Sequence, residues 1–147
     1  MYPIKPMSSD LNILVSHGEK DISIDPKIYP DSNPRLNINK FVGEGKILIL
    51  LVCHSGSSKL TPFKNSISSI AKKYITRGYK AVVAPYWSLH PIIVPVWLSE
   101  FLSVIDQGDE IVYAVHKANL KIHEIYPTIA ASACMHLYGD PHIELTH

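Results

Sequence analysis

The sequence has few cysteines, almost no net charge and no long apolar run. Its only cysteines, Cys53 and Cys134, are too few for a disulfide framework, so a reducing cytoplasm is the expected compartment. A formal net charge of +1 argues against binding to nucleic acid or to an anionic membrane. The longest uninterrupted apolar stretch, Ile47 to Cys53, is far shorter than the roughly 18 residues of a membrane span. The first residues also lack the apolar core of a signal peptide.

What is present is typical of a globular domain. Hydrophobic residues make up 46% of the chain and charged residues 18%, and 147 residues are enough to bury one core. We find no internal repeat and no low-complexity tract. Residues 1–147 are therefore treated as one domain, or as part of one.

Short apolar runs predict the strands of a sheet. The run from Lys46 to Val52 is continuously β-branched or leucine, which is typical of a central strand covered on both faces. Alternating residues in the turn-rich stretch between Glu19 and Glu44 predict two short edge strands. These two are Ile22 to Ile24 and Leu36 to Asn39. The other predicted strands are Leu11 to Ser16, Lys80 to Pro85 and Ala130 to Tyr138.

Three segments have the spacing of helices. The first begins at the capping residue Thr61 with Pro62 in its first turn, and Gly78 ends it. The others run from Pro91 to Asp106 and from Asp109 to Ile125. The alternation of strands and helices predicts an α/β layer fold with a mainly parallel sheet.

His17 and Cys53 each follow a predicted buried strand. Ligands of open α/β sheets bind beyond the carboxyl ends of the strands, and there an imidazole and a thiol on neighbouring strands can meet. A thiol with an ordinary pKa near 8.5 needs a basic neighbour to become nucleophilic at neutral pH. The N–H groups of Gly18 and Cys53 are the predicted oxyanion hole.

Other interpretations of these residues stay open. A cysteine at a strand end is often a small core residue, and a histidine before glycine is often a turn residue. Ser55, in a small-residue loop, resembles the nucleophile of a serine hydrolase with His136 or His142 as base, although Cys53 stands where that elbow has glycine. No metal-binding spacing occurs, so neither a metal nor another cofactor is expected.

Two segments resemble the motifs of caspase-like cysteine peptidases. Leu14-Val15-Ser16-His17-Gly18 is similar to their histidine motif, and Leu50-Leu51-Val52-Cys53-His54-Ser55-Gly56 to their cysteine motif. The closer similarity is to CHAT domains, bacterial relatives of caspases and separases, and it extends from about Leu11 to Leu145. The resemblance implies a caspase-like three-layer α/β/α sandwich, with His17 and Cys53 as the dyad of a cysteine endopeptidase that hydrolyses peptide bonds through an acyl-enzyme.

The resemblance also sets expectations for partners and substrate. Family members carry further strands before the histidine strand, so we expect another chain or domain to supply them, and TPR-type repeats to be regulatory partners. The substrate is a protein whose P1 residue is open, because Leu51 stands where caspases have glutamine and Gly56 lies three residues after Cys53. Leu51, Tyr86 and Trp87 are the candidate pocket residues.

A non-enzymatic function is the alternative. The chain can be an inactive caspase-like scaffold or a regulatory fragment that binds a partner through uncovered strand edges. On either interpretation we expect the isolated chain to be marginally stable or oligomeric.

Overall fold

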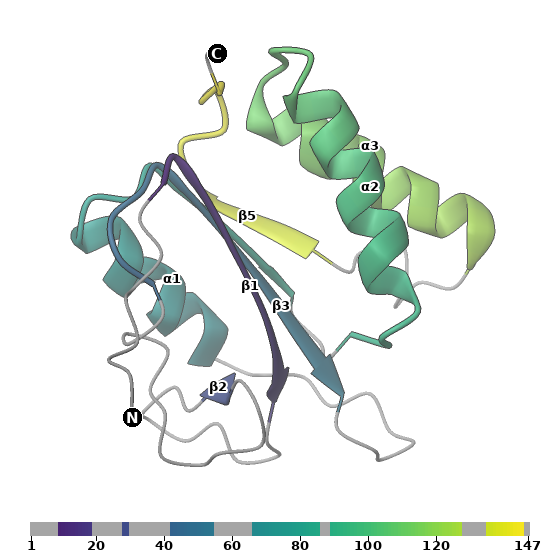
Figure 1. Ribbon diagram of the computed structural model, residues 1–147, viewed down its shortest axis with the longest axis horizontal. Helices are drawn as coiled ribbons and strands as arrows, with labels where there is room; N and C mark the ends of the chain where they lie inside the picture. Colours follow the sequence, from purple (N-terminus) through teal and green to yellow (C-terminus); the bar gives the residue numbers. More distant parts are fainter. Residues whose placement is uncertain are drawn as a thin grey trace.

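The computed structural model describes residues 9–18, 28–29, 42–54, 66–85, 89–127 and 135–145, apart from the side chains of 16–18, 28–29, 52–54 and 66–69. Five strands and three helices occur in these ranges (Figure 1). They are, in chain order, β1 (Leu11–Gly18), β2 (Ile28–Tyr29), β3 (Ile47–His54), α1 (Ser66–Thr76), β4 (Ala81–Pro85), α2 (Ile93–Ile105), α3 (Ile111–Ile125) and β5 (Met135–Gly139).

The strands form one mixed sheet in the order β2-β1-β3-β4-β5. The central strands β1, β3 and β4 are parallel, whereas β2 and β5 pair antiparallel at the two edges. The fold is therefore α/β as predicted. The mainly parallel sheet is not confirmed, because half of the strand pairings are antiparallel.

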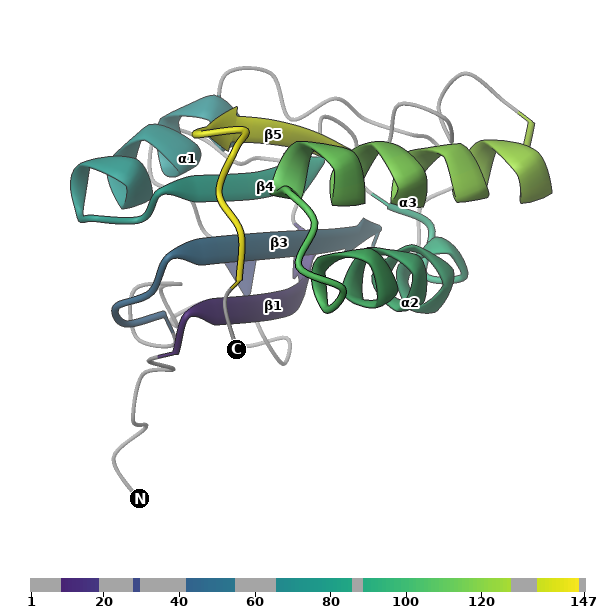
Figure 2. The same cartoon turned by 90° about the horizontal axis from the view of Figure 1, so that it is seen from above.

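Helices cover both faces of this sheet. Helix α1 lies on one face, while α2 and α3 lie on the other, which gives three layers (Figures 1 and 2). Strand β3 explains the arrangement: Ile47, Ile49 and Leu51 pack in the cluster formed with α2 and α3, and Leu48 and Leu50 pack with α1. All five are at most 1% exposed. The burial of each such side chain stabilises the fold by about 1.5–3 kcal/mol, so the continuous apolar run of β3 is what a strand between two helical layers requires.

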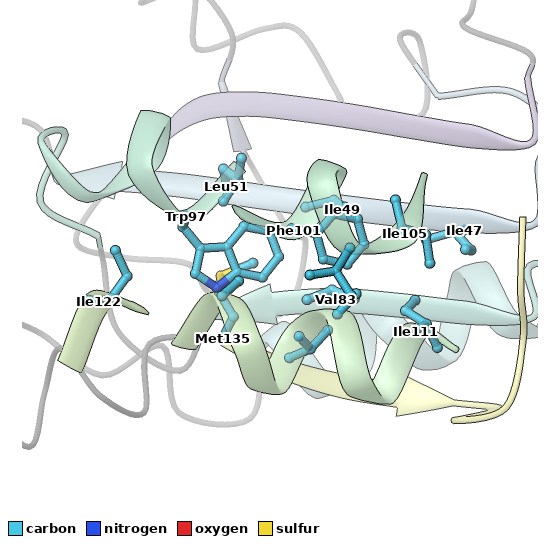
Figure 3. Packing of buried hydrophobic residues seen from close by; sticks show 14 of the residues in the cluster. Ile47, Ile49, Leu51, Val83, Trp97, Phe101, Ile105, Ile111, Ile122 and Met135 are labelled. Atoms are coloured by element: carbon cyan, nitrogen blue, oxygen red, sulfur yellow. The ribbon is translucent and has the colours of Figure 1, made fainter. Parts of the chain in front are cut away.

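Trp97 has the largest fully buried side chain of the larger cluster (Figure 3). Its ring stacks on Phe101, with centroids 5.0 Å apart and planes 12° from parallel. The indole N–H donates to Asn119 Oδ1 at 2.8 Å, and Asn119 Nδ2 donates to the Met135 carbonyl at 2.9 Å. One partly buried amide thus joins α2, α3 and the first residue of β5.

Most predicted elements are confirmed, with boundaries shifted by a few residues. Gly78 ends α1 as predicted, with φ of +114°. The Gly78 N–H donates to the Ile75 carbonyl and the Tyr79 N–H to the Tyr74 carbonyl, each at 3.1 Å, which is the Schellman pattern. The predicted start at Thr61 and Pro62 and the predicted edge strands at 22–24 and 36–39 lie outside the described residues.

A buried amide organises the edge of the sheet where the parallel strands begin. Asn12, 2% exposed, donates through Nδ2 to the Tyr79 hydroxyl at 2.7 Å and to the Glu44 carbonyl at 3.0 Å. The Tyr79 hydroxyl donates to the Gly43 carbonyl at 2.9 Å, and burial raises the pKa of Tyr79. A Cβ at Gly45 would lie 2.6 Å from Asn12 Nδ2, so only glycine fits there. In the sequence, the only indication of this network is one amide residue, Asn12, within an apolar run.

The segment after β5 caps α3. It crosses the sheet beside the beginning of that helix (Figure 2). The N–H groups of Ile111 and Val112 donate to the carbonyls of Ile143 and Pro141, at 2.9 and 3.1 Å. These contacts satisfy two of the N–H groups that every helix leaves free at its start.

The contact between His142 and Glu110 is expected to make this capping pH-dependent. His142 Nδ1 lies 3.0 Å from Glu110 Oε2, and this hydrogen bond raises the pKa of His142 above 6.5. Asp140, whose carboxylate accepts from the His142 N–H at 2.9 Å, raises it further. Because the folded-state pKa is the higher one, the stabilisation is fully present below pH 6.5 and is lost as the pH rises through the folded-state value.

An NMR titration of the His142 ring measures this effect. We expect Glu110→Gln to shift the His142 pKa down toward 6.5, while Glu144→Gln, with the same charge change, leaves it in place. An equal pKa in the native protein and in Glu110→Gln would contradict the contact.

Candidate active site at the carboxyl edge of the sheet

The backbone register places His17 opposite Cys53. Strands β1 and β3 pair in parallel over eight positions, from Leu11 opposite Ile47 to Gly18 opposite His54. Both residues are the second-last of their strands, so they lie at the carboxyl edge of neighbouring parallel strands. Adjacent strands are about 4.8 Å apart. The condition for a dyad, that the two strands be neighbours in register, is therefore met by the backbone.

Positions 17 and 53 also belong to the same face of the sheet. Successive residues of a strand alternate between faces. On β1, Leu11 and Ile13 pack against the cluster formed with α2 and α3, and on β3 Ile47 and Leu51 belong to that cluster. Positions 17 and 53 continue these two odd-numbered series along the backbone.

The predicted oxyanion hole fits the register less well. The Ile47 N–H donates to the Asp10 carbonyl at 2.8 Å. Continued along a regular parallel ladder, this pattern points the Cys53 N–H at the Ser16 carbonyl and the Gly18 N–H at the Cys53 carbonyl. Both N–H groups are then engaged in hydrogen bonds between the strands, which compete with an oxyanion. The proposed mechanism therefore assigns these two N–H groups no role.

The predicted pocket residues divide into two groups. Leu51 is fully buried among the side chains between the sheet and α2 and α3, so in this structure it is a packing residue. Tyr86 and Trp87 lie outside the described residues, as do Ser55 and Cys134. Helix α2 begins at Ile93, after β4 has ended at Pro85, and thus starts from this same edge of the sheet.

The two histidines considered as bases for Ser55 lie at different places. His136 pairs in register with Ala84, near the carboxyl end of β4. His142 follows the end of β5, where Gly139 pairs with Ala81 at the start of β4. It therefore lies at the edge where β4 begins, opposite to the edge where β3 ends at His54.

One hollow occurs at that opposite edge, with a volume of about 490 Å³. It is lined by Ser9, Asp10, Glu44, Gly45, Arg77 and Gly78. Within the described ranges no group of three or more histidine, cysteine, aspartate or glutamate side chains is placed to hold a metal ion. In the same ranges no helix is long and apolar enough to cross a membrane.

Comparison of the chain with protein-family models, with curated proteins and with solved structures finds no match.

Proposed function

We propose that the protein is a caspase-like cysteine endopeptidase with Cys53 as nucleophile and His17 as general base. The observation that carries this proposal is the backbone register, which pairs the two residues at the carboxyl ends of neighbouring parallel strands. This edge is where α/β sheets bind their ligands. The three-layer arrangement of helices around the sheet is compatible with a caspase-like fold.

The proposed reaction proceeds in two steps. In the first, His17 takes the proton of the Cys53 thiol, and the thiolate attacks the carbonyl carbon of a peptide bond. The C–N bond breaks, the amine leaves with the proton that His17 returns, and an acyl-enzyme thioester remains. In the second step His17 takes a proton from water, whose oxygen attacks the thioester. The carboxylic acid leaves and the thiol is restored.

Substrate and location follow from the same chemistry. The proposed substrate is a protein with an extended segment at the carboxyl edge, and the reaction needs no cofactor because the thiol and the imidazole supply the nucleophile and the proton transfer. The cytoplasm is the proposed compartment, since a catalytic thiol must stay reduced.

The experiment that tests this proposal is the pH profile of alkylation at Cys53, with Cys134 as the internal reference. Iodoacetamide labelling of each cysteine is followed by peptide mass spectrometry on the native protein and on His17→Ala. We expect Cys53 to react well below pH 8.5, the ordinary pKa of a free thiol, because an adjacent imidazolium stabilises the thiolate. In His17→Ala this early reactivity should be lost.

The outcomes separate the two classes of function. Labelling of Cys53 no faster than that of an ordinary thiol, in the folded native protein, would contradict the dyad and favour the inactive scaffold. Fast labelling that persists in His17→Ala would show an activated thiol whose base is another residue. His90→Ala is the matched control, because His90 is an exposed histidine that follows β4.

A further inference from the structure

The outer edge of β1 is an apolar strand edge whose pairing stops early. Among the described residues it pairs only with β2, at His17 and Gly18. The opposite edge of the same strand pairs with β3 over its whole length. Within the part of the chain that the structure describes, strand β1 thus presents Leu11 to Ser16 as an edge.

The direction of its backbone groups follows from one hydrogen bond. The Asp10 carbonyl accepts from the Ile47 N–H at 2.8 Å, so even-numbered residues of β1 point their N–H and C=O groups toward β3. The two groups of one residue point to the same side of a strand, and successive residues alternate. The backbone groups of Leu11, Ile13 and Val15 therefore point outward. The Leu11 carbonyl also accepts a hydrogen bond from Ser9 Oγ at 2.6 Å. A carbonyl oxygen has two lone pairs, so it can still accept a second hydrogen bond from another strand.

This edge lacks the features that protect edge strands. Natural edges are usually short or carry lysine, proline or inward-pointing charge. Strand β1 is eight residues long, and its sequence LNILVSHG contains neither a proline nor a lysine, arginine or carboxylate. In addition, Val15 is 47% exposed. Such an edge is suited to pair with another strand.

We propose that two copies of this chain pair antiparallel through β1, with Ile13 of one copy opposite Ile13 of the other. Strand β2 already pairs with positions 17 and 18. Of the remaining registers, only the one centred on Ile13 pairs Leu11, Ile13 and Val15, whose backbone groups point outward, with one another. Ile13 faces Ile13, and Leu11 faces Val15 in both directions. Each of these pairs exchanges two N–H···O=C bonds, and the exposed Val15 gains an apolar neighbour.

The charges agree with a second copy as the occupant. Asp10 is the only aspartate, glutamate, lysine or arginine from Ser9 to Gly18, and its partner Lys46 lies 3.4 Å away. In the proposed register Asp10 faces Ser16 of the other copy. The two Asp10 residues then lie at opposite ends of the paired strands, so no like charges meet. This inference is independent of the proposed peptidase function.

Sedimentation equilibrium of the full chain tests the pairing. We expect a dimer that Val15→Pro weakens at least about tenfold, because proline removes an outward N–H without touching the bonds to β3. Val15→Lys is the second variant, which places a charge opposite Leu11. Leu120→Lys is its matched control, since Leu120 is 39% exposed on α3, and it should leave the dissociation constant unchanged.

Cross-linking tests the register. In a Cys53→Ser, Cys134→Ser background, oxidation should join two copies through Ile13→Cys but not through Leu11→Cys, because only position 13 faces its own copy. The reverse pattern would overturn the register. A monomer at every concentration, or a dimer that survives both Val15 variants, would overturn the proposal. A monomer with slowly exchanging amides at Leu11, Ile13 and Val15 would instead show that another segment of the same chain covers the edge.

Discussion

Replacing Cys53 by alanine is expected to abolish peptide hydrolysis and to leave the fold intact. The proposed mechanism makes the Cys53 sulfur the only protein atom that bonds to the substrate carbonyl carbon, so its removal leaves no acyl-enzyme. Removal of the nucleophile in peptidases of this kind costs on the order of a thousandfold or more in turnover. Cleavage of a peptide library, read by mass spectrometry, measures the loss, and circular dichroism during heating verifies the fold.

Cys134→Ala is the control for this experiment. It removes the only other thiol, and we expect turnover to stay within about twofold of the native value, because in the proposed mechanism this thiol bonds to no substrate atom. Hydrolysis that survives Cys53→Ala would remove the peptidase hypothesis. Hydrolysis lost in Cys134→Ala, with the fold preserved, would assign the nucleophile to the other cysteine.

Trp97→Ala is expected to give the largest loss of stability. The indole is fully buried, stacks on Phe101 and donates to Asn119. Truncation of a buried tryptophan costs about 3–5 kcal/mol through lost contacts and the cavity that remains. This approaches the whole free energy of unfolding of a typical domain, about 5–15 kcal/mol. Urea denaturation should therefore show a much lower midpoint, or no folded baseline.

Trp97→Phe separates packing from hydrogen bonding. Phenylalanine fills most of the space and still stacks on Phe101, but it cannot donate to Asn119. We expect a loss of about 0.5–1.5 kcal/mol, the usual net contribution of one hydrogen bond to stability. If both variants have the same urea midpoint as the native protein, the stacked pair does not hold α2 against the sheet.

The sequence was most informative where apolar residues recur along one face of a helix or strand. Helices α2 and α3 were predicted from three- and four-residue spacing. In α2 the spacing selects the buried residues, whereas in α3 it selects Val115 and Ile122, which are buried, and Val112, which is exposed. The continuous run that forms β3 predicted burial on both faces, and its alternate residues indeed enter two different clusters. Such patterns are local, because they reflect which residues of one element avoid water.

Pairing directions and long-range polar contacts were not predictable in this way. Nothing in Met135 to Gly139 encodes that β5 runs antiparallel to β4, because direction depends on where α3 returns the chain. Strand β2 is two residues long and has no periodicity to detect. The partners of Asn12 include Glu44 and Tyr79, which approach it only after the sheet has formed.

The candidate site could be predicted from the sequence only in part. The sequence placed His17 and Cys53 at strand ends, and the register confirms that these ends are neighbours. The resemblance named Leu51 as a pocket residue, although the apolar run that contains it already predicted burial, and the structure places it in the core with α2 and α3. The assignment of chemistry to the pair stays a prediction that the alkylation profile tests.

The parallel pairing of β1 with β3 has a consequence for how the chain folds. Leu11 must find Ile47 across the whole intervening segment, whereas α2 and α3 follow one another directly and contact each other early. Closing a long loop is entropically costly, and parallel pairings of high sequence separation form slowly. We therefore expect β1 to dock late in folding. Until it does, the apolar strand β3 is the outermost strand of the nascent sheet, and it is the segment from which aggregation of newly made chains would start.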